Sequence, residues 1–214
     1  MDKKFWHQRW EQGEIGFHES QVNPALVDHL GRLNLAKGAR LFLPLCGKTL
    51  DIAWLLEQGY RIAGVELSPL AINELFQALD LAPEITPVGK LTRYSTANMD
   101  IWVGDIFDLS SSMLGAVDAV YDRAALVALP EEMRQRYAVH LVVLTHGAPQ
   151  LLITYEYDQS LYDGPPFSVC EKELMQHYGN NYQLKQVAHD EIAGGFKGKV
   201  VAALSTWLLQ GVKP

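Results

Sequence analysis

The sequence predicts an α/β fold of the Rossmann-like type, a mostly parallel sheet with helices on both faces. Short apolar runs alternate along the chain with segments of helical period, which is typical of βαβ units. Polar residues end four of these apolar runs, where ligands bind in such folds. The last two apolar runs, near residues 182–189 and 199–209, share one loop and therefore predict an antiparallel pair at one edge of the sheet.

Composition indicates the size and class of the protein. The chain has 214 residues, 48% hydrophobic and 20% charged, a globular mix that suits a single domain over residues 1–214. The net charge of −7 argues against a nucleic-acid partner, because such binding depends on clustered Lys and Arg. The N-terminus lacks an apolar leader and no apolar run has membrane-spanning length, so we expect a soluble cytoplasmic protein without a membrane partner.

Cysteine and histidine usage predicts no metal site. The two cysteines, Cys46 and Cys170, have no CxxC spacing, and the seven histidines show no HxxxH spacing. Isolated cysteines fit a reducing compartment. The sequence also lacks the Gly-x-Ser-x-Gly signature of a serine nucleophile.

Capping residues locate three of the expected helices. Asn23 and Ser68 each precede a proline that suits the first position of a helix. Ser168, with Glu171 three residues later, fits a capping box for the last helix. Two further helices are expected, one from about Leu50 to Gly59 and one that Pro130 opens and that ends near residue 146.

Apolar runs locate the strands between these helices. The expected parallel strands cover residues 39–45, 60–65, 99–103, 116–121 and 150–155. The stretch that contains Pro83 and Pro87 is expected to be a loop, because proline disfavours strand interiors. The polar, proline-containing segment from Asp158 to Phe167 is a second expected loop, either a lid over the site or an ordinary surface connection.

The residues that end the parallel strands form the candidate site. Ligands of doubly wound sheets bind beyond the carboxyl ends of the strands, at the topological switch point. The four strand ends that carry candidate residues are Leu45-Cys46-Gly47, Glu66, Asp105 and Asp122-Arg123. Their clustering, rather than any single member, predicts a binding site.

Glu66 is the predicted ribose ligand. It lies about twenty residues after the first turn, where nucleotide-binding folds place an acid. A carboxylate accepts hydrogen bonds from both hydroxyls of a vicinal diol. The alternatives are a solvated glutamate at the strand end or a cap for the helix at Ser68.

The first turn favours a cofactor without a pyrophosphate. It lacks the full G-x-G-x-x-G pattern, and only Gly47 permits close approach of the backbone. Gly47-Lys48-Thr49 does not complete a P-loop either, because Phe42 stands where that motif needs glycine. A nucleoside cofactor such as S-adenosylmethionine therefore suits the turn better than a dinucleotide. The alternative is a plain strand-to-helix turn.

Two other strand ends offer polar contacts. Asp105 is expected to accept a hydrogen bond from an adenine amino group, or alternatively to cap the turn before Ile106 and Phe107. Arg123 is expected to bind a carboxylate of the cofactor or of a substrate through its guanidinium fork. Its alternative role is a structural pair with Asp122 or another nearby acid.

Aromatic residues precede the sheet. Trp6, Trp10 and Phe17 are candidates to cover a cofactor and attract a sulfonium cation. The alternative is an amphipathic N-terminal helix that packs on the core, which we prefer for Trp6.

Several motifs together resemble those of the thiopurine S-methyltransferase family in its bacterial form, nearly from end to end. The Leu-Pro-Leu-Cys-Gly-Lys run is the most specific of them. The motifs are Phe5-Trp6-His7-Gln8-Arg9-Trp10, Gly16-Phe17-His18, Leu43-Pro44-Leu45-Cys46-Gly47-Lys48 with Asp51, Gly64-Val65-Glu66-Leu67-Ser68, Tyr121-Asp122-Arg123-Ala124-Ala125-Leu126 and Gly164-Pro165-Pro166-Phe167.

The resemblance implies a class I methyltransferase fold with a seven-stranded sheet that contains one antiparallel strand. It implies S-adenosylmethionine as cofactor, with residues 1–35 as an N-terminal cover over cofactor and substrate. The implied cofactor residues are Trp10, Leu45, Glu66, Arg123 and, beside the adenine, Ile106. Gly47 and Asp105 join them as candidates from the strand ends described above. Phe17 is implied near the substrate, and Arg123 is implied to face both cofactor and substrate and to act in catalysis.

The implied activity is methyl transfer from S-adenosylmethionine to the sulfur of aromatic or heterocyclic thiols such as 6-mercaptopurine. Two alternatives stay open: methylation of selenium or tellurium species in detoxification, and a cofactor-binding sensor without turnover. The expected partner is a small thiol or selenol, and the expected state is a monomer. One departure concerns the substrate, because Lys197 and Lys199 stand near the C-terminal hairpin where animal members carry a second arginine.

Overall fold

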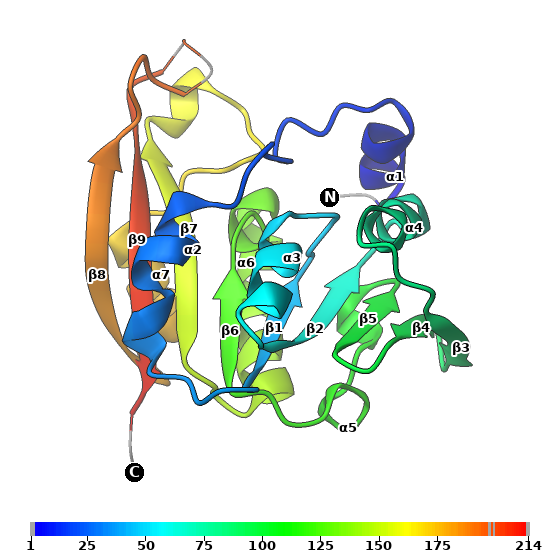
Figure 1. Ribbon diagram of the computed structural model, residues 1–214. Helices are drawn as coiled ribbons and strands as arrows, with labels where there is room; N and C mark the ends of the chain where they lie inside the picture. The colour runs from blue at the N-terminus through cyan, green and yellow to red at the C-terminus, as the bar shows by residue number, and fades with distance from the viewer. Residues whose placement is uncertain (1–2, 197, 199, 213–214) are drawn as a thin grey trace.

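The computed structural model describes residues 3–196, 198 and 200–212, and its centre is one twisted sheet (Figure 1). In this part of the chain the sheet has nine strands in the order β3-β4-β5-β2-β1-β6-β7-β9-β8. Their bounds are β1 Arg40–Pro44, β2 Arg61–Glu66, β3 Glu84–Val88, β4 Leu91–Ser95, β5 Met99–Val103, β6 Ala119–Asp122, β7 Gln150–Tyr157, β8 Tyr182–Glu191 and β9 Ala202–Gly211.

Seven of these strands form the predicted core of the sheet. Strands β5, β2, β1, β6 and β7 run parallel. Strand β9 runs antiparallel to β7, and β8 pairs antiparallel with β9 at the edge. The predicted parallel strands and the predicted antiparallel pair are therefore confirmed.

The sheet is wider than predicted, because residues 84–95 form a hairpin and not a loop. Strand β4 pairs antiparallel with β5, and Pro87 of β3 stands opposite Thr92 of β4. Strand β3 is an edge strand and is largely exposed, so the missing N–H of Pro87 leaves no buried ladder group unpaired. The expectation of a loop was wrong because proline disfavours a strand that is hydrogen-bonded on both sides, whereas an edge strand such as β3 tolerates it.

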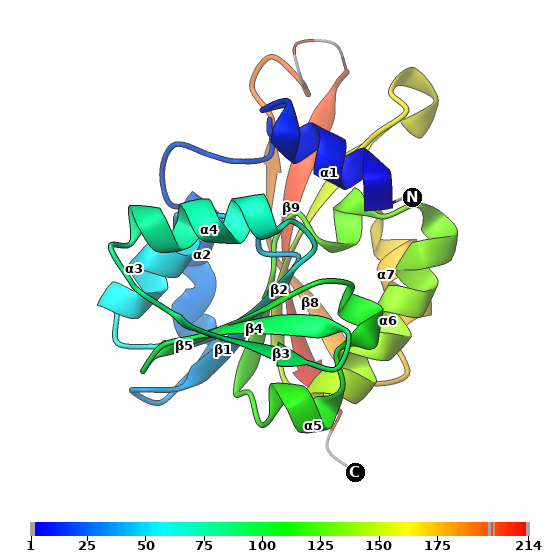
Figure 2. The ribbon, with the colours of Figure 1, turned by 90° about the vertical axis from the view of Figure 1, so that its right-hand side faces the viewer.

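Helices cover both faces of the sheet, as Figure 2 shows: α2, α3 and α4 lie on one face and α5, α6 and α7 on the other. Two clusters of buried side chains fill the layers between the sheet and its helices, one cluster on each face. Successive residues of β1 point to opposite faces, so Leu41 belongs to one cluster and Phe42 to the other. The α-helices are α1 Lys3–Glu11, α2 Pro24–His29, α3 Asp51–Glu57, α4 Pro69–Ala78, α5 Ser111–Leu114, α6 Glu131–Thr145 and α7 Glu171–Tyr178. The short 3-10 helices are η1 Leu30–Leu33, η2 Ile106–Asp108, η3 Leu126–Ala128 and η4 Gln159–Leu161.

Two of the three predicted helix caps are confirmed. The side chain of Asn23 accepts a hydrogen bond from the N–H of Ala25 (3.0 Å), and that of Ser68 from the N–H of Ala71 (3.3 Å). The capping box at Ser168 was wrong. Helix α7 begins after Cys170, and Ser168 instead accepts a hydrogen bond from the N–H of Tyr157 on β7 (3.0 Å).

Helix α1 lies apart from these layers, across the end of the sheet where the parallel strands finish (Figure 2). Its Trp10 is buried, while Lys3 and Lys4 at its start are exposed. The amphipathic N-terminal helix considered for the aromatic residues is therefore present. Among the described helices, none is long and apolar enough to cross a membrane.

Candidate functional site

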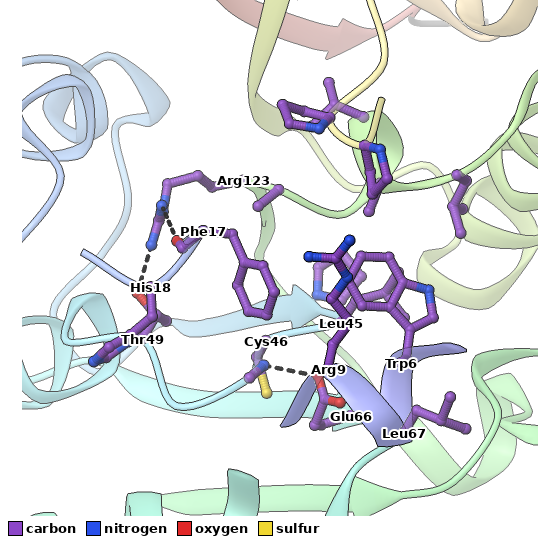
Figure 3. A pocket seen from close by; sticks show the side chains of 18 of the residues that line it. Trp6, Arg9, Phe17, His18, Leu45, Cys46, Thr49, Glu66, Leu67 and Arg123 are labelled. Atoms are coloured by element: carbon purple, nitrogen blue, oxygen red, sulfur yellow. Dashed lines mark hydrogen bonds between the residues drawn. The ribbon is translucent and has the colours of Figure 1, made fainter. Parts of the chain in front are cut away.

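A pocket opens at the carboxyl ends of the parallel strands, beneath α1. Its lining includes every predicted site residue, so the structure brings together side chains from widely separated parts of the chain. These residues are Trp10, Phe17, Leu45, Gly47, Glu66, Asp105, Ile106 and Arg123. Figure 3 shows Glu66 and Leu45 on one side of the pocket and Arg123 on another, with the ring of Phe17 between them.

The turn after β1 has an unusual backbone that faces the pocket. Leu45 has a φ of 47° and Gly47 a φ of 53°, both in the left-handed region. A non-glycine residue in this region is uncommon and costs free energy, and such residues concentrate at functional sites. The N–H of Cys46 donates to the carbonyl of Val65 on β2 (3.0 Å), which fixes the turn. A cofactor contact at this turn stays a prediction, with the plain strand-to-helix turn as its alternative.

Glu66 is buried at the end of β2, with only 5% of its surface exposed. Its Oε2 accepts a hydrogen bond from the N–H of Gly47 (2.9 Å), and its Oε1 from the N–H of Ser68 (2.8 Å). Burial raises the pKa of the Glu66 carboxyl, and these backbone donors oppose that shift. The solvated-glutamate alternative is wrong. A carboxylate oxygen can accept two hydrogen bonds, so each oxygen of Glu66 can accept one more from a ligand.

Aromatic rings join α1 to the pocket. The Phe17 ring meets Trp10 and Trp6 edge to face, at centroid distances of 5.4 and 5.8 Å. The indole of Trp10 also lies against Gly47, and the ammonium of Lys48 lies 6.0 Å from its ring centroid. Trp6 lines the pocket as well, which the preference for a purely structural role did not anticipate.

Arg123 is largely buried and held by several partners. Its Nε donates to Oδ2 of Asp51 (2.9 Å), and its Nη2 to Oγ1 of Thr49 (3.0 Å). Its Nη1 has two longer contacts of 3.4 Å, to the carbonyl of Phe17 and to the carboxylate of Glu19. Burial is the largest effect and opposes the charge of Arg123, but Asp51, Tyr121 and Glu19 together outweigh it and raise the pKa of the guanidinium. Arg123 therefore pairs with Asp51 and, at a longer distance, with Glu19, and not with Asp122.

Asp122 does not face the pocket, because successive side chains of β6 point to opposite faces of the sheet. Its carboxylate accepts hydrogen bonds from the hydroxyl of Tyr137 (2.6 Å) and from the N–H of Leu126 (3.1 Å). Burial raises the pKa of Asp122 to about 6. Asp122 is therefore a buried core residue whose contacts stabilise the fold, and it is not part of the pocket.

Asp105 has the predicted capping role in addition to its place in the pocket wall. Its Oδ1 accepts a hydrogen bond from the N–H of Phe107 (3.0 Å), at the start of η2. Its Oδ2 pairs with the ammonium of Lys3 on α1 (2.8 Å). Burial of Asp105 is outweighed by Lys3 and the backbone donor, which lower the pKa of its carboxyl. The adenine contact stays a prediction.

Several pocket residues were not predicted from the sequence. Glu19, Thr49 and Asp51 surround Arg123, and Tyr155 of β7 contributes a further aromatic ring to the wall. Asp51 is 1% exposed and stands in the first turn of α3. The sequence signal that pointed to it is its place in the motif that begins at Leu43, although no role was predicted for it.

The loop between β7 and α7 contributes Pro165 and Pro166 to the pocket wall, and Phe196 contributes from the β8–β9 connection. The loop is therefore part of the site, while its closure as a lid stays a prediction. Lys197 and Lys199, considered in place of an arginine, lie outside the described residues. Within those residues, no group of His, Cys, Asp and Glu side chains is arranged to hold a metal ion.

The sequence of this chain is similar to a protein-family model and to several named proteins. The model of a family described as thiopurine S-methyltransferase matches residues 1–206. Proteins named thiopurine S-methyltransferase from Teredinibacter turnerae and Xanthobacter autotrophicus are 53% and 54% identical over 209 and 211 residues. These matches cover 98% of this chain and 97% and 99% of the two relatives.

Solved structures of methyltransferases share the fold. The magnesium protoporphyrin IX methyltransferase of Synechocystis PCC 6803, solved with bound SAH, superposes with a TM-score of 0.67 at 14% identity, over 99% of this chain and 100% of that one. A 1,6-didemethyltoxoflavin-N1-methyltransferase from Burkholderia thailandensis gives 0.64 at 16% identity, over 97% and 87%. These likenesses confirm the predicted class I methyltransferase fold.

Proposed function

This chain belongs to the thiopurine S-methyltransferase family, and from that membership we propose that it transfers the methyl group of S-adenosylmethionine to the sulfur of aromatic or heterocyclic thiols such as 6-mercaptopurine. The observation that carries the proposal is the convergence of Glu66, Arg123 and the aromatic residues of α1 on one pocket at the sheet's carboxyl edge (Figure 3). The match to the family model and the two relatives confirms the family resemblance predicted from the sequence motifs.

The pocket residues fit an adenosine cofactor that has no pyrophosphate. Glu66 is buried, fixed by two backbone donors, and retains acceptor capacity for the two ribose hydroxyls. A Cβ at Gly47 would lie 3.1 Å from the Trp10 ring, which would have to shift to admit it, and the φ of 53° also disfavours a side chain there. Asp105 and Ile106 would flank the adenine, and Leu45 would contact the cofactor from the first turn.

Arg123 would bind the carboxylate end of the cofactor and face the acceptor. Its charge is secured by Asp51, and its Nη groups make only one hydrogen bond shorter than 3.4 Å among the described residues. Phe17 would border the acceptor thiol, and the cation of Arg123 would favour the anionic thiolate over the thiol. No general base is assigned, because thiols of this class are already acidic.

When bound, S-adenosylmethionine supplies a methyl group activated by its positive sulfur. The protein's contribution is then to bind and orient. The pocket has to hold the thiol sulfur about 3–3.5 Å from the methyl carbon and in line with the bond that breaks. The rings of Trp10 and Phe17, together with Pro165 and Pro166 across the pocket, would exclude water from the reacting atoms.

A transfer assay tests the proposal. The protein is incubated with labelled S-adenosylmethionine and 6-mercaptopurine, and the methylated product is separated and counted. We expect transfer well above a blank without protein, and its absence would contradict the thiol activity. Calorimetry with S-adenosylhomocysteine separates the outcomes, because a binding module without turnover would bind this product and transfer nothing.

The same proposal includes further points on assembly, location, domain organisation and acceptor class. The chain acts as a monomer in the cytoplasm, as one folding unit over residues 1–214, with residues 1–35 as a cover over the pocket. Sedimentation equilibrium at several concentrations tests the monomer. Headspace analysis for volatile methylated selenides, with selenite-fed cells that express the protein, tests whether selenium species are a second class of acceptor in detoxification.

A further inference from the structure

Asp51 connects three elements around Arg123. It stands in the first turn of α3, and its Oδ1 accepts a hydrogen bond from the backbone N–H of Asn23, where α2 is capped (2.8 Å). Its Oδ2 accepts two, from the hydroxyl of Tyr121 on β6 (3.1 Å) and from Nε of Arg123 (2.9 Å). The Asp51 side chain is 1% exposed and accepts hydrogen bonds from three donors, so its position is strongly restrained.

These contacts restrict the guanidinium of Arg123 to one orientation. Asp51 holds its Nε, and Thr49 from the same turn accepts from its Nη2 (3.0 Å). The other contacts that the guanidinium makes are to the carbonyl of Phe17 and to Glu19, both at 3.4 Å and therefore weak. The Nη edge is thus the part of Arg123 on which a ligand can act, and Glu19 is a partly exposed carboxylate that a ligand carboxylate can replace.

We propose that Asp51 is a positioning residue, which fixes Arg123 with its Nη edge available to a ligand carboxylate and joins that orientation to the segment leading into α2. The inference rests on the proposed function, since it assumes that Arg123 receives the carboxylate of the cofactor. It adds a role for a residue that touches no reacting atom.

The substitution Asp51→Asn separates this role from general support of the fold. An asparagine oxygen in the place of Oδ1 still accepts from the N–H of Asn23. Its amide nitrogen would occupy the place of Oδ2, where the hydroxyl of Tyr121 can rotate to accept a hydrogen bond. Nε of Arg123 can only donate, so its contact is lost in this orientation, and the negative charge beside Arg123 is lost in either orientation of the amide.

The binding experiment compares two ligands by calorimetry. S-adenosylhomocysteine carries the amino-acid carboxylate, and 5′-methylthioadenosine lacks it. We expect Asp51→Asn to lower the affinity for S-adenosylhomocysteine about 10-fold or more, as for loss of a charge-assisted contact, and to change that for 5′-methylthioadenosine less than about 2-fold. Equal losses for both ligands, or none for either, would overturn the positioning role.

Two further variants keep the test decisive. Asp100→Asn is the matched control, because Asp100 pairs with Arg40 and Arg93 on the sheet outside the pocket lining, and it should leave both affinities unchanged. Should Asp51→Asn not fold, Asp51→Glu retains the charge but displaces Arg123, and the same selective loss is expected. Failure of methyl transfer with intact S-adenosylhomocysteine binding would count against the proposed function alone, whereas no binding by the unaltered protein overturns both.

Discussion

The indole of Trp10 covers Gly47 so closely that a Cβ built on this glycine would lie 3.1 Å from Cζ2 and 3.3 Å from Cη2 of the ring. Gly47 also has a φ of 53°, a conformation that side chains adopt only at a cost. Helix α1 therefore rests on the one glycine of the first turn, and this contact joins the cover of the pocket to its floor.

Gly47→Ala should weaken cofactor binding through this contact. The added methyl has to displace Trp10, and we expect the affinity for S-adenosylhomocysteine to fall roughly 10-fold, equivalent to about 1.4 kcal/mol. Gly59→Ala is the control, because Gly59 has a φ of 84° but nothing within 4 Å of its position for a Cβ. Both variants should lose similar stability in urea, and calorimetry should show the loss of affinity at Gly47 only.

Glu66→Gln should remove recognition of the ribose hydroxyls. The unaltered protein is expected to bind adenosine more tightly than 2′,3′-dideoxyadenosine, because hydrogen bonds to a charged acceptor contribute about 1.5–3 kcal/mol. In the variant this preference should shrink about 10-fold. The ratio of the two affinities cancels any loosening of the turn, since both ligands meet the same pocket. An unchanged ratio would show that Glu66 does not bind the ribose and only accepts hydrogen bonds from the N–H groups of Gly47 and Ser68.

Asp105→Asn tests the predicted adenine contact. The asparagine oxygen can keep the cap at Phe107, but the charge that pairs with Lys3 is lost. If the carboxylate accepts the adenine amino group, the unaltered protein binds adenosine far better than inosine, whose carbonyl it repels. The variant should discriminate about 10-fold less, because its amide nitrogen can donate a hydrogen bond to the inosine carbonyl. Equal discrimination by both proteins would leave Asp105 with its capping role only.

Asp122 should make the stability of the fold fall as the pH rises. Its pKa of about 6 lies above the 3.8 of the unfolded chain, so between these values the folded state binds the extra proton. Its contribution is therefore fully present below pH 4, is lost as the pH rises through 6, and is constant above that. The difference corresponds to about 3 kcal/mol.

Asp122→Asn should consequently stabilise the protein at pH 7 and not at pH 4. An asparagine satisfies both neighbours, because its oxygen accepts from the N–H of Leu126 and its amide donates to the Tyr137 hydroxyl. Urea unfolding of both proteins at pH 4, 5, 6 and 7 measures the difference in free energy of unfolding. A difference that does not grow between pH 4 and 6 would show that the carboxyl titrates normally.

The position of the site followed from the sequence because carboxyl ends of parallel strands meet at one edge of a sheet. Leu45, Glu66, Asp105 and Arg123 each end a strand or begin the turn after it, so their clustering needs only the order of the elements. The partners of Arg123 were beyond reach, because Asp51 is 72 residues away in sequence and no local pattern joins them.

The strands and helix caps also divide into features that the local sequence determines and features that depend on distant segments. The caps at Asn23 and Ser68 depend on hydrogen bonds that span two or three residues, so the local sequence determined them. The β3–β4 hairpin and the contact that takes Ser168 away from α7 depend on which strand lies alongside, β5 in the first case and β7 in the second. By itself the sequence determined the order of the parallel strands and the helices between them, the edge where the pocket forms and part of the set of residues that line it. Only the tertiary structure decided how those side chains are paired, because pairing depends on packing between distant segments.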